Sequence, residues 1–324
     1  MSCLLWTGQT SCHDLLGREI PCAGTGQDGA FRAGTPWPQP RLVPRGDTVL
    51  DALTGLTWSR CATPLEFPLT WPEALSAIRG LNAQGWLGRS DWRLPNRREL
   101  RSLVSYQTRR PALPEGHPFT DLFAGWFWTS TTLAGLPAYA WWVNLDGGRM
   151  FFGGKGQSFL VWPVCGRADL PVTGQERCYD EEGREIACGG SGQDGELRQG
   201  CPWPTPRLET TSTGVLDRLT GLVWHRDADI CRGAVSWADA LEAVAALEGS
   251  WRLPNVNELE SLVDCSRSAP ALPPGADFSG VCESYWSSST SLFEPDWAWA
   301  LYLEQGGIGV GQKRGRHFHV WAVR

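Results

Sequence analysis

The chain has 324 residues, of which 42% are hydrophobic and 20% charged, and its formal net charge at pH 7 is −6. This composition is typical of a folded globular protein of about two domains and excludes a disordered chain. The acidic balance argues against general nucleic-acid binding. Every apolar run falls short of the roughly 20 residues of a membrane span.

The sequence repeats itself, and each copy begins with a segment rich in glycine and proline, which predicts turns and extended chain. Cys12 and Cys22 have nine residues between them, and Cys178 and Cys188 have the same spacing, so each pair is expected to form a disulfide. Disulfides favour an oxidising compartment. We therefore expect a periplasmic, cell-surface or secreted protein, although the first residues do not resemble a signal peptide.

Each copy continues with a predicted β-hairpin and a helix. In the first copy, strands at 49–51 and 56–58 flank a four-residue turn, and Thr70 with Glu73 forms a capping box at the start of the helix. The second copy repeats the hairpin and the helix. After the helix, the first copy has about seven additional residues, which predicts an extra loop near 85–88.

The motif Trp-Arg-Leu-Pro-Asn at 92–96 recurs at 251–255 and predicts the start of a second helix in each copy. The proline disfavours helical angles at the residue before it, the asparagine is a good N-cap, and a glutamate three residues later can return a hydrogen bond to the cap. Apolar residues then recur at i, i+3 and i+4 and give one buried face. We expect helices over 96–104 and 255–263, with a structural role.

Alternating large and small residues predict antiparallel strands in the rest of each copy. In the first copy they include 127–131 and 139–145, and the second copy repeats the same order. The two copies are joined by a short linker at 168–172. We therefore predict two domains, 1–168 and 169–324, each with its Cys-containing opening at its N-terminal end.

The order of these motifs resembles a known domain family. The matching parts of the first copy, all of which recur in the second, are Leu53-Thr54-Gly55-Leu56-Thr57-Trp58, Trp92-Arg93-Leu94-Pro95-Asn96 with Glu99-Leu100, Phe127-Trp128-Thr129-Ser130-Thr131, and Val161-Trp162-Pro163-Val164. They are similar to the C-terminal domain of a Legionella collagen-like adhesin. The resemblance implies an α+β, C-type-lectin-like fold in tandem, with two helices, a small antiparallel sheet and long loops in each domain. It also implies a surface or secreted binding role without known catalysis. Because a fold does not determine its ligand, we expect an adhesion or binding protein whose partner, a glycan, another anionic ligand or a protein, must be inferred from the residues.

Metal-binding and catalytic patterns are weak in this sequence. Glu294-Pro295-Asp296 is similar to the calcium-binding loop of C-type lectins, but we cannot assemble the six to eight oxygen ligands that calcium takes. His317 and His319 alternate, yet no cysteine or acid lies at a zinc-ligand spacing from them. Phosphate-binding loops and Gly-x-Ser-x-Gly elbows are absent from the sequence. We therefore expect no metal, no cofactor and no enzyme activity.

Two further cysteines suggest a third disulfide. Cys265 and Cys282 occur together where the first copy has the aromatic residues Tyr106 and Phe123, so the paired change predicts that they are bonded. The pairing of five cysteines stays open: Cys3, Cys61, Cys165, Cys201 and Cys231. An alternative function is an oxidoreductase similar to formylglycine-generating enzymes, with Cys265 and Cys282 as its reactive pair. A structural subunit at a fibre tip is a further alternative.

Candidate ligand-binding residues lie on the last hairpin of each copy. In the second copy this hairpin carries a basic group, and on a strand Arg314 and Arg316 would share one face while His317 and His319 share the other. The guanidinium groups would recognise an anionic ligand such as a sulfated glycan, and aromatic residues would stack on sugar rings. The predicted ligand-binding residues are Trp142, Asn144, Arg149, Trp297, Tyr302, Lys313, Arg314, Arg316, His317 and His319. Four tryptophans without a tryptophan counterpart are the better candidates for exposed contacts, namely Trp86, Trp126, Trp142 and Trp297. A solvated edge that prevents aggregation is the alternative interpretation of the basic group.

Overall fold

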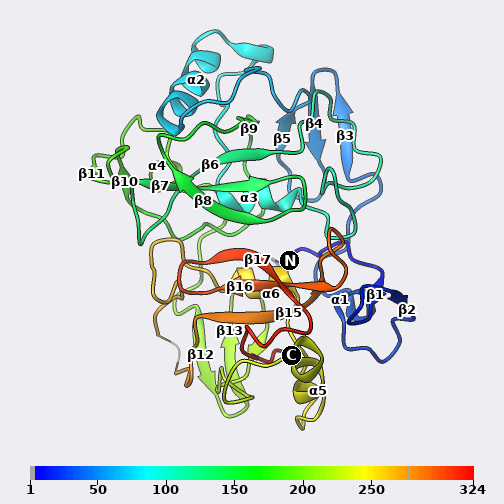
Figure 1. Cartoon of the computed structure of the whole chain (residues 1–324). Helices are drawn as coiled ribbons and strands as arrows, with labels where there is room; N and C mark the ends of the chain where they lie inside the picture. Colours follow the sequence, from blue (N-terminus) through cyan, green and yellow to red (C-terminus); the bar gives the residue numbers. More distant parts are fainter. Residues whose placement is uncertain (1–3, 276) are drawn as a thin grey trace. The chain divides into compact units, whose positions relative to one another are not determined.

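The computed structural model describes residues 4–275 and 277–324 (Figure 1). Its helices and antiparallel sheets confirm the predicted α+β class, and they fall into two units, each built from separate stretches of chain. The central unit comprises Trp37–Val104 and Arg110–Pro202. The terminal unit comprises the chain up to Pro36 together with Ser105–Arg109 and Trp203–Arg324.

Each unit combines parts of both sequence repeats. We call residues 4–36 and 169–202 the first and second openings, and the remainder of each repeat its body. The first opening lies in the terminal unit with the second body, and the second opening lies in the central unit with the first body. The expected domains, 1–168 and 169–324, follow the repeats of the sequence, whereas these units exchange the two openings.

The exchange rests on a short helix in each opening. Helix α1 (Asp28–Phe31) packs against strand β15 (Ser284–Thr290), and Figure 1 shows the blue first opening beside this orange strand. Helix α4 (Asp194–Leu197) packs in the same way against β6 (Trp126–Thr132). Residues 168–172 are therefore not a linker between units. They pair with the chain near Cys201 inside the central unit.

The central unit contains two antiparallel sheets, with strand orders β3-β4-β5-β9 and β6-β7-β8. Helix α2 packs on one face of the second sheet, where Trp71 and Leu75 join Trp128 in one apolar cluster. Helix α3 packs against β6 and β7, and the Arg97 guanidinium lies 4.0 Å from the ring centroid of Trp141, which points to the opposite face. The elements not yet bounded are β3 (Leu42–Arg45), β4 (Thr48–Asp51), β5 (Thr57–Ser59), α2 (Trp71–Ala83), η1 (Trp86–Gly88), α3 (Arg97–Ser102), β7 (Tyr139–Asn144), β8 (Met150–Gly154), β9 (Val164–Cys165), β10 (Cys178–Tyr179) and β11 (Glu185–Ile186).

The terminal unit repeats this plan, with the sheets β12-β13-β14 and β15-β16-β17. Trp237 from α5 packs with Trp286 and Ala298 in its main apolar cluster. Its other elements are β1 (Cys12–His13), β2 (Glu19–Ile20), β12 (Leu208–Thr211), β13 (Gly214–Asp217), β14 (Val223–Trp224), α5 (Trp237–Ala245), α6 (Val256–Ser261), β16 (Trp297–Tyr302) and β17 (Gly307–Gln312). The short helix η1 of the central unit occupies the extra loop that the sequence predicts near 85–88.

The predicted helix starts are confirmed. Helix α2 begins after Thr70, whose backbone N–H donates to the Glu73 carboxylate at 2.9 Å. Helix α3 begins after Asn96, whose side chain accepts the N–H of Glu99 at 3.0 Å, while the Glu99 carboxylate accepts the N–H of Asn96 at 2.9 Å. The arginine of the motif explains its recurrence, because Arg93 donates to both oxygens of Glu99 at 2.7 and 2.8 Å. A buried, bidentate ion pair of this kind fixes the cap rather than forming a catalytic site.

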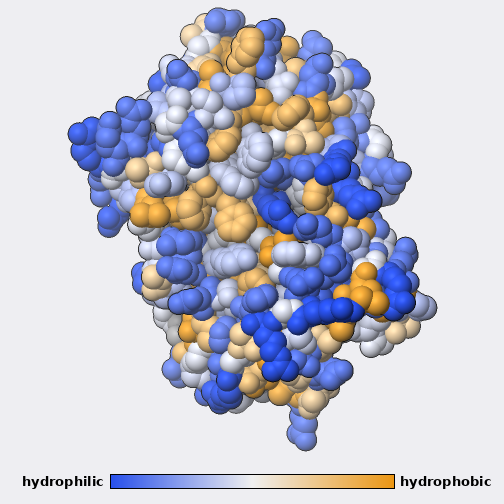
Figure 2. Space-filling view, viewed as in Figure 1, coloured by the Kyte–Doolittle hydropathy of each residue, from blue (hydrophilic) through white to orange (hydrophobic). Residues whose placement is uncertain are grey.

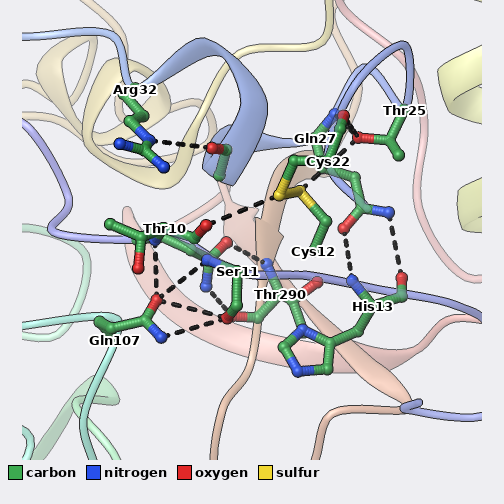
Figure 3. The surroundings of a disulfide bond; sticks show 12 residues. Thr10, Ser11, Cys12, His13, Cys22, Thr25, Gln27, Arg32, Gln107 and Thr290 are labelled. Carbon is green, nitrogen blue, oxygen red and sulfur yellow. Dashed lines mark hydrogen bonds between the residues drawn. A yellow bond between two sulfur atoms is a disulfide. The ribbon is translucent and has the colours of Figure 1, made fainter. Parts of the chain in front are cut away.

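The predicted disulfides Cys12–Cys22 and Cys178–Cys188 are confirmed. Around the first disulfide, Gln27 bonds to the backbone of His13, and Gln107 accepts the N–H of Thr10 at 2.8 Å (Figure 3). The third predicted disulfide is wrong, because Cys282 carries a thiol that donates to the Gly280 carbonyl. Cys3 lies outside the described residues.

Candidate binding surfaces

An aromatic shelf lies on the main sheet of the central unit. It consists of Trp126 from β6, Trp142 from β7, Phe151 from β8, and Phe159 from the loop after β8. The ring centroids of Trp142 lie 6.5 Å from Trp126 and 6.2 Å from both phenylalanines, and 45% of the surface of Trp126 is exposed. The other three side chains are half-buried. Adjacent rings that are partly exposed, as these are, are a typical feature of ligand-contact surfaces.

The shelf follows from the strand register and from the residues beneath it. Trp142 lies opposite Trp128 on β6 and Phe151 on β8, so these side chains project from the same face of the sheet. Trp128 is fully buried, and its ring packs 4.5 Å from that of Phe159. The shelf therefore lies at the solvent edge of the apolar cluster under α2, and its rings have a fixed support.

Among its described residues, the terminal unit has no equivalent shelf. By strand register, Ser284, Ala300 and Gly309 occupy the positions of Trp126, Trp142 and Phe151. These small side chains provide no ring for contact with a ligand. Trp126 and Trp142 have no tryptophan counterpart in the second repeat, and the sequence therefore indicated them as candidates for exposed contacts. The structure places both on the shelf. Sequence reasoning missed Phe151 and Phe159. Phe151 is followed directly by Phe152, and the sequence of such a pair does not show which ring faces the ligand side of the sheet.

Asn144 and Arg149, both predicted to bind ligand, lie half-buried at the turn between β7 and β8. The Asn144 side chain accepts the N–H of Asp146 at 2.7 Å, and its own N–H donates to the Arg149 carbonyl at 2.8 Å. Asn144 pairs in register with Trp126. The turn therefore adjoins the shelf, and Asn144 has a structural role in closing it.

The basic residues of the last hairpin do not form one patch. Lys313 is fully buried, its ammonium donates to the carbonyls of His13 and Asp14 at 3.1 and 3.2 Å, and it lies 4.3 Å from the ring centroid of Trp237. It anchors the first opening and is not accessible to a ligand. Burial lowers the pKa of Lys313 to about 7.

Three exposed residues of this region form what we call the basic turn: Arg314, Arg316 and His317. They follow the end of β17 at Gln312, so the expected alternation of faces along a strand does not apply to them. Arg316 lies 3.7 Å from the carboxylate of Asp239. The basic turn therefore retains an exposed positive charge that is partly neutralised by α5.

Trp297 and Tyr302 are not brought together by the structure. They stand at the two ends of β16 and, being five positions apart, project from opposite faces of the sheet. The Tyr302 ring packs 5.5 Å from that of Phe318, in the core of the terminal unit. A shared sugar-stacking role for Trp297 and Tyr302 is therefore excluded by this geometry.

Both units have a groove between their long helix and their opening. In the central unit a groove of about 580 Å³ separates α2 from the β10–β11 hairpin, and its walls include Leu75, Ile186 and Glu181. Figure 2 shows strongly hydrophilic residues where Figure 1 places this hairpin. The terminal unit has a groove of about 510 Å³ between α5 and the first opening, with Phe31 and Leu241 in its walls. Sequence reasoning missed both grooves, because their walls come from different repeats.

A polar cluster in the terminal unit was also missed. One carboxylate oxygen of Asp229, the sulfur of Cys282 and a ring nitrogen of His319 all lie within 4.8 Å of one another, and all three residues are half-buried. The Asp229 carboxylate is 3.0 Å from Nδ1 of His319. The residues come from three segments far apart in the sequence, so no spacing rule could have found them.

The mixed helices and antiparallel sheets and the doubled body define a protein of two repeated α+β bodies. A family model described as the Lcl C-terminal domain matches residues 47–165 and 213–324. The two matches cover more than half of the chain, which therefore belongs to the Lcl C-terminal domain family. A comparison with curated proteins found no match. Family membership and the two disulfides are consistent with an extracellular protein. No helix of the described residues is long and apolar enough to cross a membrane.

Proposed function

We propose that the protein is a non-catalytic, extracellular binding protein whose central unit holds a carbohydrate ligand on the aromatic shelf. The observation that carries the proposal is the shelf itself, where Trp126 and Trp142 offer ring faces beside the polar β7–β8 turn. A sugar ring has an apolar C–H face that packs on an aromatic ring and hydroxyl groups that bond to neighbouring polar atoms. Rigid aromatic residues supply such contact area at a low cost in conformational entropy.

Family membership and fold support a binding role without naming the ligand. The family model covers both bodies, and we propose that each body has the C-type-lectin-like arrangement of two helices beside a small antiparallel sheet. Because a fold hosts many functions, the ligand class rests on the shelf and not on the fold. The shelf belongs to one unit only, so we expect one carbohydrate site per chain.

A glycan array probed with the whole chain tests this proposal. Binding to a group of related glycans, lost when Trp126 and Trp142 are replaced together by serine and alanine, supports it. The matched control replaces Tyr302 by asparagine, which is the residue of the first body at that position in the register. Retention of glycan binding by the Trp126 and Trp142 variant, or a lack of binding to any glycan, would contradict the proposal.

A further inference from the structure

The polar cluster of Asp229, Cys282 and His319 points to a function that is separate from the carbohydrate site. We propose that these three side chains bind one divalent transition-metal cation, with zinc as the best fit, in the terminal unit. Thiolate, imidazole and carboxylate are the three ligand types that proteins use for zinc, and the thiolate disfavours calcium and magnesium. The sequence alone predicts no metal site here. The proposal differs because Asp229 and Cys282 come close to His319 only when the chain folds.

The spacing of the three ligand atoms suits a tetrahedral ion. With about 2.0 Å from zinc to oxygen or nitrogen and about 2.3 Å to sulfur, ligand atoms around a tetrahedral zinc lie about 3.3–3.6 Å apart. The three atoms of the cluster lie within 4.8 Å of one another, and the Asp229 oxygen is 3.0 Å from the His319 nitrogen. Side-chain movements of about 1 Å are enough to bring atoms that lie up to 4.8 Å apart to this spacing. The fourth position is left for water or for another ligand.

Each ligand is held in place by its own segment. The Asp229 carboxylate accepts the N–H of Gly233 at 3.1 Å, within a turn closed by the Arg232 N–H. His319 donates its backbone N–H to Ser284, and its carbonyl accepts the N–H of Trp286. These bonds fix three backbone segments before any ion binds, which is the preorganisation that a metal site requires.

The position of Cys282 depends on a tyrosine. The Cys282 N–H donates to the hydroxyl of Tyr285, whose side chain is fully buried. In the central unit the corresponding position of β6 is Phe127, which has no hydroxyl group. Tyr285 is therefore a positioning residue that accompanies the cysteine.

The first body provides an internal comparison, because none of the ligands occurs there. By the shared pattern of bridges and backbone bonds, Thr63, Phe123 and Leu160 stand where the second body has Asp229, Cys282 and His319. With Phe127 in place of Tyr285, four polar residues of the second body gather at one place where the first body has mostly apolar residues. A structural role shared by both bodies does not explain this concentration.

The local charges favour a cation. Asp227 adds a carboxylate that accepts the backbone N–H of Asp229 at 3.0 Å, and its only cationic partner in the described residues is the exposed Arg232, at 2.8 Å. A cysteine binds zinc as its thiolate, so forming the metal–sulfur bond releases the thiol proton to solvent.

Metal titration of the whole chain tests the proposal. The protein, with its two disulfides intact and stripped of metal with a chelator, is titrated with zinc against a chromophoric competitor and with cobalt as a spectroscopic probe. We expect one ion per chain and a sulfur-to-cobalt charge-transfer band. Cys282→Ser should abolish the band, and Cys282→Ser and His319→Leu should each weaken zinc binding by more than about 100-fold, beyond the usual effect of losing an outer-shell partner.

Two matched variants separate the site from nonspecific thiol binding. Cys231→Ser and Cys61→Ser remove other half-buried cysteines and should leave the stoichiometry and the cobalt band unchanged. Zinc should raise the melting temperature of these variants and of the unmodified protein, but not that of Cys282→Ser. His319→Leu introduces the residue found in the first body, and circular dichroism checks that it folds. The absence of stoichiometric binding, or full binding by Cys282→Ser, would overturn the proposal.

Discussion

The hydroxyl of Ser289 donates to the carboxylate of Asp28 at 2.6 Å, although 261 residues separate them in the chain. The central unit has the same relationship, because Thr131 donates to Asp194 at 2.7 Å. Both aspartates are buried and belong to an opening, and both hydroxyls belong to the body of the other repeat. Each pair is therefore a direct hydrogen bond between one opening and the body of the other repeat.

The first prediction concerns pH. Burial raises the pKa of Asp28 to about 6, from an ordinary value near 3.8, against the opposing effect of its bonds to Ser289 and Thr7. Between these values the folded protein keeps a proton that the unfolded chain releases, so stability falls as pH rises through this window. Asp28→Asn removes the titration. We expect the unmodified protein to lose about 2 kcal/mol relative to this variant between pH 4.5 and 7.5.

Urea unfolding of both proteins at the two pH values measures this difference. Every other titratable group, Asp194 included, is common to both proteins. The difference between their stabilities therefore reports the titration of Asp28 alone. Parallel stability curves for the two proteins would show that the Asp28 carboxylate is ionised throughout and that the assigned burial is wrong.

The second prediction concerns the lysines, of which the chain has two, Lys155 and Lys313. Both are fully buried, and Lys155 donates to the carbonyls of Tyr179 and Asp180 at 3.1 and 3.0 Å, as Lys313 does to the first opening. An amine-reactive ester should therefore leave both unmodified in the native protein at pH 8 and modify both in urea, as read by peptide mass spectrometry. Rapid modification of Lys313 in the native protein would show that it is exposed, as the sequence suggested, and would contradict its burial by the first opening.

The third prediction concerns the aromatic shelf. Trp142→Ala should lower the affinity for a glycan found on the array by at least about tenfold, because the ring supplies both contact area and a rigid support. Nearly half of the surface of Trp126 is exposed, so Trp126→Ser should weaken binding while changing the melting temperature by no more than a typical surface substitution. Isothermal titration calorimetry measures the first effect and differential scanning calorimetry the second. Unchanged affinity in both variants would rule the shelf out as the binding surface.

The fourth prediction concerns the basic turn. Arg314→Ser with Arg316→Ser should lower the salt concentration at which the chain elutes from heparin, because exposed guanidinium groups attract sulfates through interactions that salt screens. The matched control, Arg218→Ser with Arg267→Ser, removes two exposed arginines of the same unit. Equal shifts in both double variants would mean that net charge alone determines retention and that the basic turn has no specific role.

Sequence reasoning was most successful where a structure depends on neighbours in the chain. The bond between Asn96 and Glu99 spans three residues, and the Cys12–Cys22 disulfide spans ten, so the local pattern contains the information needed. The buried partner of Arg93 is also local, at Glu99. The cap and the disulfide were predicted correctly, and the ion pair between Arg93 and Glu99 is the one contact that the structure adds to the motif.

The failures involve residues that are distant in sequence. Cys282 was paired with Cys265 because both differ from the first copy, but its neighbours in space are Asp229 and His319, which the sequence separates by 90 residues. Lys313 was placed on a surface because lysine is usually exposed, but the first opening covers it. The exchange of openings also could not be predicted, because two similar bodies present the same binding surface to either opening.

The placement of each opening against the body of the other repeat is tested most directly by measuring amide hydrogen–deuterium exchange in two glutamine variants. The Gln9 side chain accepts the N–H of Thr290 at 2.9 Å and donates to its carbonyl at 2.8 Å, while Gln175 donates to the carbonyl of Thr132 at 3.3 Å. Gln9→Ala should speed amide exchange in β15 and leave β6 unchanged, and Gln175→Ala should do the reverse. Faster exchange of β6 in Gln9→Ala, with β15 unchanged, would contradict the exchange of openings.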